Sequence, residues 1–382
     1  MPFGGLNVML MGDFHQFSPV GNKTNSLYSQ GRGNKSERKT TVVGRAIYSQ
    51  FEHVVTLTEQ NRIKDQVWKQ ILDRSRTGDC TRDDLETIRK LVLTNKNCVV
   101  PDFDAEPWCN AVLITPRNGM RSQWNAAALR KHCKKTGNVL YICEAEDTVG
   151  KSREPPSMEE KTVIAGLDPV KKLRSLHQRI EIAKGMKAMV TTNLATEADL
   201  ANGSRGEIVD IKLYPQENVD KEQAATTGIV KLRYPPVTII FKPIHATFPQ
   251  FEGLKKGEIP LFPSEYGFNI GTITNPKIPV HRRQYVLTPA YAFTINKVQG
   301  QTIGYVIVDI GKIPRPFSLD PFAVYVALSR STGRDSIRLL RDFEDHLLTK
   351  HPSEDLRTED ARLELLTKDT TEKYEAGFYN WM

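Results

Sequence analysis

The pattern of apolar and polar positions predicts an α/β protein. The apolar run Val8–Met11 is typical of a buried strand, and the polar cluster "GDFHQFSPV" follows it directly. Residues 63–95 carry apolar positions at helical spacing, and "AVLITPRN" (111–118) with "GMRSQWNAAALRKHC" predicts a strand, a turn and a helix. Such a unit builds a parallel sheet, whose strands present polar side chains at their carboxyl ends.

A second pattern begins near residue 181 and predicts a β-rich region. Short alternating segments, "KAMVTTNL", "GEIVDIKLY", "GIVKLRY" and "VTIIFKPI", are separated by Pro and Gly, as in a small β-barrel or sheet. After about residue 280 the chain returns to strand, helix and strand, and "VYVALSRS" and "IRLL" are expected to complete the sheet. The β-rich region is therefore expected to be inserted into an α/β domain.

Composition and charge fit a soluble globular protein with a polyanionic partner. The 382 residues are 39% hydrophobic and 26% charged, with a formal net charge of +8. No apolar stretch is long enough to span a membrane. The basic excess suits nucleic acid, although basicity alone is weak evidence. The five cysteines include no C-x-x-C pair, so we expect reduced thiols and no metal site.

Four polar clusters at predicted strand ends are specific only in combination. They are "GDFHQFSPV", "LTEQNRI", "NKVQGQT" and "YVALSR". In this order they resemble the later motifs of superfamily-one helicases, and most closely the petite-integration-frequency (Pif-type) DNA helicases and the related helicases of Helitron transposons. "AKGMKAMVTTNL" with "LANGSRGEIV", and "FKPIHATF", strengthen the match, which runs from about Phe3 to Phe343.

The resemblance implies a motor that uses ATP and Mg²⁺ to move 5′ to 3′ on single-stranded DNA and at duplex junctions. ATP would lie between two RecA-like domains, the first of them truncated and the second with an SH3-like insert. The implied ranges are 1–60 for the remnant of the first domain, 61–195 with 281–345 for the second, 196–280 for the insert and 346–382 for a helical tail.

The same resemblance assigns residues around the nucleotide. Gln16 is implied to be the γ-phosphate sensor, with Asp13 shaping its turn. Arg62 and Arg330 are implied to be arginine fingers, because a guanidinium stays charged and can fork onto two phosphate oxygens. Gln299 and Gly300 are implied to abut the triphosphate and the DNA backbone. Two alternatives remain open from the residues themselves, since Asp13 can simply cap a turn and Arg62 can pair with Glu59.

A second set of residues is expected to contact DNA phosphates, which position a strand without reading its sequence. These residues are Thr115, Arg117, Asn118, Asn202, Arg205, Thr294, Asn296 and Lys297. For the turn "NGSRG" a plain β-turn is an equally good interpretation. Four aromatic residues suit base stacking, but we expect most of them to fill the small β-rich core: Phe241, Phe248, Phe251 and Tyr266.

The Walker A loop and Walker B carboxylate that such a helicase needs are not found in their expected places. The nearest match, "AEDTVGKS" (145–152), has acidic neighbours that would repel phosphate, and Pro155–Pro156 prevents a following helix. We therefore expect the sequence to correspond to the C-terminal part of the motor, and the isolated chain to show no appreciable ATP hydrolysis.

Three functional hypotheses remain. The first is part of an ATP-dependent 5′-to-3′ DNA helicase, acting in repair, recombination, telomere maintenance or Helitron transposition, in the nucleus or the mitochondrion. The second is a non-catalytic remnant that binds single-stranded DNA. The third is a protein-interaction module whose SH3-like insert binds peptides. DNA-stimulated ATP hydrolysis separates the first two, and salt-dependent DNA binding separates both from the third.

Overall fold

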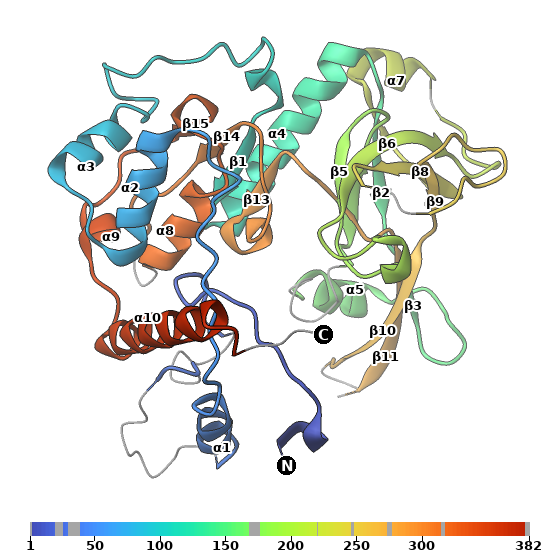
Figure 1. Cartoon of the computed structure of the whole chain (residues 1–382). Coiled ribbons are helices and arrows are strands. Elements are labelled where there is room, and N and C mark those ends of the chain that lie inside the picture. Colours follow the sequence, from blue (N-terminus) through green and yellow to red (C-terminus); the bar gives the residue numbers. More distant parts are fainter. Residues whose placement is uncertain are drawn as a thin grey trace. The chain divides into compact units, whose positions relative to one another are not determined.

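The computed structural model describes residues 2–19, 26–29, 39–167, 176–219, 221–245, 248–272, 277–314 and 318–378. The chain divides into two compact units (Figure 1): unit 1 comprises Met1–Pro116 and Thr294–Met382, and unit 2 comprises Arg117–Phe293. In chain order, unit 2 lies between the two parts of unit 1. It is longer than the 196–280 range expected for the β-rich insert, and it includes the helix that begins at Asn118.

Unit 1 is built on a parallel sheet. β1 pairs with β14, and β14 pairs with β15, both in parallel. β1 is buried at every position, as expected for a strand covered on both faces. In chain order the elements of unit 1 are η1 (Pro2–Gly5), α1 (Lys39–Tyr48), α2 (Gln66–Thr77), α3 (Arg82–Arg89), η3 (Trp108–Asn110), β1 (Val112–Thr115), η5 (Ile295–Val298), β14 (Val306–Val308), α8 (Pro321–Leu328), η6 (Arg334–Ser336), β15 (Ile337–Leu339), α9 (His346–Thr349) and α10 (Glu354–Glu375).

Three helices of unit 1, α2, α8 and α9, pack against one another beside this sheet (Figure 1). Asp65 caps the start of α2 by accepting hydrogen bonds from the backbone of Val67 and Trp68. The cap is itself held by Arg334, whose Nε lies 2.6 Å from the Asp65 carboxylate. Trp68 is fully buried and donates to Ser331 at 2.9 Å, so α2 is fixed close to the end of α8.

Two sequence expectations for unit 1 are wrong. Val8–Met11 is not a strand, and its side chains are exposed, with Met9 at 80% and Met11 at 88%. A strand needs a neighbour for its backbone groups, and none of the described residues pairs with this segment. The run "VYVAL" is not a strand either but part of α8, which Asp320 caps and Pro321 opens.

Unit 2 is rich in β-structure, as predicted. Its largest sheet has five antiparallel strands in the order β12-β5-β6-β8-β9, and two three-stranded sheets have the orders β4-β2-β7 and β10-β11-β3. The elements are α4 (Asn118–Thr136), β2 (Leu140–Glu144), β3 (Glu146–Val149), α5 (Met158–Ala165), β4 (Arg179–Ile182), β5 (Lys187–Val190), η4 (Thr196–Ala198), β6 (Arg205–Lys212), α7 (Lys221–Thr227), β7 (Ile229–Lys231), β8 (Thr238–Pro243), β9 (Ile259–Leu261), β10 (Ser264–Ile270), β11 (Ile278–Gln284), β12 (Leu287–Pro289) and β13 (Ala292–Thr294), in which the chain passes back to unit 1.

The aromatic residues of unit 2 mostly fill its core. Phe241 is fully buried, and Phe248 and Tyr266 pack against the same hydrophobic cluster. Phe251 remains 40% exposed and lies beside Phe248, with ring centroids 5.8 Å apart. The core interpretation therefore fits three of the four aromatic residues.

Two further observations concern the whole chain. None of the five cysteines forms a disulfide bond. No helix among the described residues is both long enough and apolar enough to cross a membrane.

Candidate nucleotide and nucleic-acid site

The segment after the expected first strand forms a tight turn around Asp13. The backbone N–H of His15 donates to the Asp13 carboxylate at 2.9 Å, and the Gln16 amide nitrogen Nε2 donates to it at 3.1 Å. Arg76, in the last turn of α2, donates to the same carboxylate at 2.6 Å. Burial alone would raise the pKa of Asp13, but the Arg76 charge and these hydrogen bonds outweigh it and hold the pKa below its ordinary value. Asp13 thus remains ionised and shapes the turn.

Gln16 reaches a second segment that is distant in sequence. The Gln299 amide nitrogen Nε2 donates to Gln16 Oε1 at 3.0 Å, across a separation of 283 residues. Gln299 directly follows η5, and both Gln299 and Gly300 are exposed. Gly300 has φ +78°, a left-handed conformation that favours glycine. The structure therefore brings together three of the residues expected at the nucleotide.

Arg62 lies beside the same segment. Its Nε donates to the Thr302 hydroxyl at 2.9 Å, and its Nη1 donates to the Ser329 carbonyl at 3.2 Å. Residues 59–62 are not helical, and the guanidinium bonds to these two residues instead of to Glu59. The alternative of a Glu59 pair on one helical turn is thus wrong.

Arg330 lies just beyond α8 and is 2% exposed. Its hydrogen bonds end on uncharged groups: Nε on the Val326 carbonyl at 2.7 Å, Nη1 on the Gln301 carbonyl at 3.1 Å, and Nη2 on the Ser329 hydroxyl at 2.6 Å. Burial and the neighbouring Arg62 charge lower the pKa of Arg330 to about 10. Arg330 is therefore still protonated at pH 7, but its charge is poorly stabilised.

Ser329 joins the two arginines, because its carbonyl accepts from Arg62 and its hydroxyl accepts from Arg330. Among the described residues neither guanidinium has a carboxylate partner. Two cations near each other, beside a pair of side-chain amides, suit a polyanion such as a terminal phosphate. We call Gln16, Arg62, Gln299 and Arg330, with Thr302 and Ser329 between them, the cation–amide cluster; all of it lies in unit 1.

Sequence reasoning missed three residues that organise this cluster. Thr302 ends the motif "QGQT", and Ser329 precedes the arginine in "LSR", so both were visible as motif neighbours. His15 lies between Asp13 and Gln16 and is 3% exposed. Nothing in the sequence around His15 indicates its partners, which are Arg76 in α2 and Asp360 in α10.

The residues expected to contact DNA lie in both units. In unit 1, Thr115 is fully buried and donates to Asp309 at 3.2 Å, so its hydroxyl is not presented at the surface in this structure. Thr294 is half-buried, whereas Asn296 and Lys297 on η5 are exposed. The two residues on η5 are therefore the accessible members of this set in unit 1.

In unit 2, Arg117 and Asn118 begin α4, and Asn118 is exposed. Exposed N–H groups at a helix start can bind phosphate, which is compatible with the expected contact. Asn202 lies in the turn that precedes β6, and its backbone N–H donates to Asn193 at 2.9 Å. Arg205 opens β6 over the Phe293 ring at 5.5 Å, and burial lowers its pKa. Residues 202–203 form a turn before β6, as in the turn interpretation of "NGSRG".

The segment "AEDTVGKS" does not have Walker A geometry. Glu146–Val149 is strand β3, which pairs with β11, and the chain then turns back through Gly150 to an isolated bridge between Val149 and Glu154. The next helix after this segment, α5, begins only at Met158. Among the described residues no group of three or more His, Cys, Asp and Glu side chains is arranged to hold a metal ion.

No family model matches the chain. It is 24% identical over 371 residues to the ATP-dependent DNA helicase PIF1 of Emericella nidulans, covering 92% of this chain and 44% of that protein. It is 22% identical over 354 residues to the PIF1 helicase of Xenopus laevis, covering 92% and 43%. The chain thus spans less than half the length of these relatives.

A solved structure of the Pif1 helicase from Bacteroides, in complex with ADP-AlF3 and single-stranded DNA, superimposes with a TM-score of 0.54 at 18% identity. The match covers 95% of this chain and 68% of that one. It supports the RecA-like α/β fold expected from the sequence. The resemblance of this chain to the Pif1-type DNA helicases, over about nine tenths of its length, is therefore confirmed.

Proposed function

We propose that this chain is part of an ATP-dependent DNA helicase that moves 5′ to 3′ along single-stranded DNA. The observation that carries the proposal is the convergence of Gln16, Arg62, Gln299 and Arg330 in one cation–amide cluster, although they come from four separate segments. Four residues that served only as surface charges or turn caps would have no common reason to converge in space. Residues that contact one phosphate group must converge on it.

In this proposal the cluster faces the terminal phosphate of ATP. The Gln16 amide lies next to the γ-phosphate and senses its presence, while Gln299 links that position to η5. Arg62 and Arg330 supply positive charge where the transferred phosphoryl group develops negative charge. Because Arg330 is held by carbonyls and a hydroxyl, an incoming phosphate offers its guanidinium a stronger, charge-assisted acceptor.

The described residues do not suggest where Mg²⁺ would bind, so we assign no residue of this chain to it. The sequence also holds no strict G-x-x-x-x-G-K-[ST] loop. In this proposal, the loop that binds the ATP phosphates and the ligands of Mg²⁺ are not among the residues of the cation–amide cluster. ATP hydrolysis should accordingly require a Walker-motif segment in addition to this chain.

The nucleic-acid partner in this proposal is single-stranded DNA and its junction with duplex. The solved relative named above holds single-stranded DNA. In this chain the exposed Asn296 and Lys297 on η5, and Asn118 at the start of α4, are our candidates for phosphate contacts. A nuclear role in DNA repair, recombination, telomere maintenance or Helitron transposition is proposed from the resemblance alone.

The test is ATP hydrolysis with and without oligo-dT, by the chain alone and by the chain joined to the Walker-motif segment of a Pif1 helicase. We expect turnover only in the joined form, with stimulation by oligo-dT. Arg330→Ala should reduce that turnover about 1,000-fold or more, as for other arginine fingers, and Arg330→Lys should not restore it because an ammonium cannot fork.

The matched control is Arg82→Ala, which removes an exposed arginine of α3. It should leave turnover within about twofold, because surface substitutions away from a site have small effects. Unchanged turnover in Arg330→Ala would show that the finger assignment is wrong. A joined form that binds oligo-dT without hydrolysing ATP would instead support a non-catalytic DNA-binding protein.

A further inference from the structure

The long helix α10 binds three separate stretches of the first 60 residues. Asp360 lies 2.9 Å from His15 Nε2, and Glu359 accepts from the Tyr48 hydroxyl at 2.6 Å. Further along the helix, the Thr370 hydroxyl accepts from the backbone N–H of Val54 at 3.0 Å. More than 300 residues separate the partners in each pair. The helix thus holds the segment that includes Gln16 against the rest of unit 1.

His15 is the contact nearest to the cation–amide cluster. Its side chain is 4% exposed, and its two ring nitrogens face two acceptors, the Arg76 carbonyl at 2.9 Å and the Asp360 carboxylate at 2.9 Å. Both contacts are complete only when each nitrogen carries a hydrogen, because neither acceptor can donate. The ring is therefore held between the last turn of α2 and the first half of α10.

The position of His15 is transmitted directly to Gln16. His15 and Gln16 are adjacent in the turn that Asp13 closes, and the same Arg76 that accepts from His15 donates to Asp13. Gln16 in turn accepts from Gln299. A continuous set of hydrogen bonds therefore runs from Asp360 in α10 through the turn to the cation–amide cluster.

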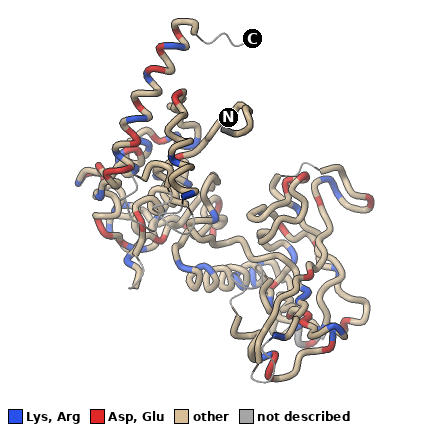
Figure 2. Tube along the Cα trace, turned by 90° about the horizontal axis from the view of Figure 1, so that it is seen from below, with Lys and Arg blue, Asp and Glu red and all other residues tan. Residues whose placement is uncertain are grey.

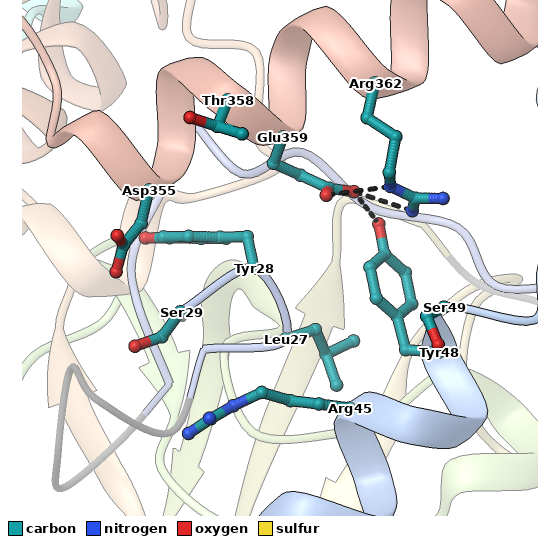
Figure 3. A pocket seen from close by; sticks show the side chains of 10 residues that line it. All are labelled: Leu27, Tyr28, Ser29, Arg45, Tyr48, Ser49, Asp355, Thr358, Glu359 and Arg362. Atoms are coloured by element: carbon teal, nitrogen blue, oxygen red, sulfur yellow. Dashed lines mark hydrogen bonds and ion pairs between the residues drawn. The ribbon is translucent and has the colours of Figure 1, made fainter. Parts of the chain in front are cut away.

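A second attachment of α10, at Tyr48, is polar and incompletely packed (Figure 3). Tyr48 donates to Glu359, which Arg362 also binds at 2.8 and 3.0 Å. Burial and the Glu359 carboxylate raise the pKa of Tyr48, so its hydroxyl remains a donor. Beside this trio is a pocket of about 270 Å³, lined by α1, α10 and residues 27–29. Here α10 is fixed by discrete hydrogen bonds, which single substitutions can remove one at a time.

We propose that Asp360 and His15 are positioning residues, through which α10 holds Gln16 at the distance from Gln299 that the proposed γ-phosphate site requires. The role of Gln16 as a sensor rests on the proposed function. The claim that His15 and Asp360 fix the position of Gln16 does not rest on it. Neither residue touches the nucleotide. Each acts by fixing the turn from which the Gln16 amide projects.

The first arm of the test measures hydrogen exchange in the chain as it exists. Asp360→Ala should make the amides of His15 and Gln16 exchange about tenfold faster, because the ring loses the acceptor that holds it. The amides of α2 and α8 should keep their rates. Asp360→Asn should restore most of the protection, since an amide oxygen still accepts from Nε2.

The matched control is Tyr48→Phe. It removes a hydrogen bond to the neighbouring residue of the same helix, but it keeps the ring that packs edge-on against Phe14 at 6.1 Å. It should leave the exchange rates of His15 and Gln16 within about twofold. If Tyr48→Phe accelerates them as much as Asp360→Ala does, or if Asp360→Ala leaves them unchanged, the proposal is overturned.

The second arm measures steady-state ATP hydrolysis in the form joined to a Walker-motif segment. A misplaced sensor should lower kcat about tenfold or more in Asp360→Ala while KM for ATP stays within about twofold, because the sensor acts on the transferred phosphate. If the contacts of α10 only stabilised the fold, the fraction of active enzyme would fall equally in His15→Ala, Asp360→Ala and Tyr48→Phe. If the wild-type joined form does not hydrolyse ATP, the proposed function fails, and the exchange arm still decides whether Asp360 positions Gln16.

Discussion

Arg330 is a cation in surroundings that do little to stabilise its charge. At 2% exposure, with Arg62 beside it and only neutral acceptors around it, its pKa is lowered to about 10. Burying a charge without an opposite charge is unfavourable, and such arrangements are concentrated at functional sites. An anion that enters the cluster would relieve the repulsion between the two arginines. If the cluster is the proposed phosphate site, binding of the phosphate and relief of this repulsion at Arg330 are therefore linked.

Asp84 gives a test of electrostatics outside the candidate site. Its carboxylate binds Arg74 twice at 2.7 Å and closes the capping box of α3 with Thr81. We expect Asp84→Asn to lower the free energy of unfolding by about 1.5–3 kcal/mol at pH 7, the range for hydrogen bonds to charged groups. Urea unfolding followed by tryptophan fluorescence measures this difference. The exposed neighbour Asp83 supplies the control, and Asp83→Asn should change it by less than about 0.5 kcal/mol.

The pH dependence of this loss has a defined sign. The Arg74 hydrogen bonds, opposed by burial, hold the pKa of Asp84 below its ordinary 3.8. A lowered folded-state pKa gives stability that is present above 3.8 and lost as the pH falls through the lower folded value. The difference between wild type and Asp84→Asn should therefore be constant near neutrality and shrink below pH 3.8. A difference that grows on acidification would contradict the assignment.

At the residue scale the sequence predicted the arginines and the amides of the cation–amide cluster and missed the residues that support them. Gln16, Arg62, Gln299 and Arg330 stand in motifs whose order is informative, and the structure brings them together. The contact of His15 with Asp360 joins positions 345 residues apart; His15 stands within "GDFHQFSPV", but Asp360 belongs to none of the motifs. Such a contact depends on how α10 packs, and a single sequence contains no measure of that.

At the scale of elements, the failures of the sequence-based expectations have physical causes. "VYVAL" is apolar throughout, so its periodicity cannot distinguish a buried strand from a buried helix. The deciding signals lie just before it, in Asp320 and Pro321, which cap and open α8. β1 and α4 were predicted correctly because a short buried run is followed directly by a long helical segment that ends at Gly137.

The end of α2 supplies a prediction about an element boundary. Gly78 caps this helix with φ +80°, and a Cβ there would lie 2.4 Å from the backbone oxygen of Lys350. We expect Gly78→Ala to lower the melting temperature strongly, because left-handed strain of about 1 kcal/mol adds to a clash with backbone that cannot rotate away. Gly137 caps α4 with φ +72°, and a Cβ added there would meet no atom within 4 Å.

Gly137→Ala is thus a matched control that contains the strain without the clash. Gly137→Ala should lower the free energy of unfolding by only about 1 kcal/mol. Thermal unfolding of both variants measures how much more stability Gly78→Ala loses. Equal losses in the two variants would mean that the approach of Lys350 to the end of α2 is not a tight contact in solution.

At the scale of the whole molecule, the excess of basic residues lies in unit 2, which contains 26 Lys and Arg against 18 Asp and Glu, whereas unit 1 contains 27 of each. Figure 2 shows Lys and Arg interspersed with Asp and Glu along most of the chain. α4 is an exception, since its sequence "NGMRSQWNAAALRKHCKKT" contains basic but no acidic residues. Arg121 in this helix has a pKa lowered by burial. A net charge of +8 with such local accumulations favours salt-dependent binding of a polyanion.

The salt dependence of DNA binding tests whether Lys297 is one of the phosphate contacts. Each contact with single-stranded DNA contributes about 0.7 to the slope of log K against log salt concentration, because binding releases condensed counterions. Lys297→Gln should therefore reduce the magnitude of this slope by about 0.7, in fluorescence anisotropy titrations of oligo-dT. Lys368→Gln removes the same charge from a 76% exposed side chain on α10, where no DNA contact is expected, and should leave the slope unchanged. Equal changes in both variants would mean that overall charge, and not a local contact at η5, governs binding; an unchanged slope in Lys297→Gln would remove this residue from the proposed DNA interface.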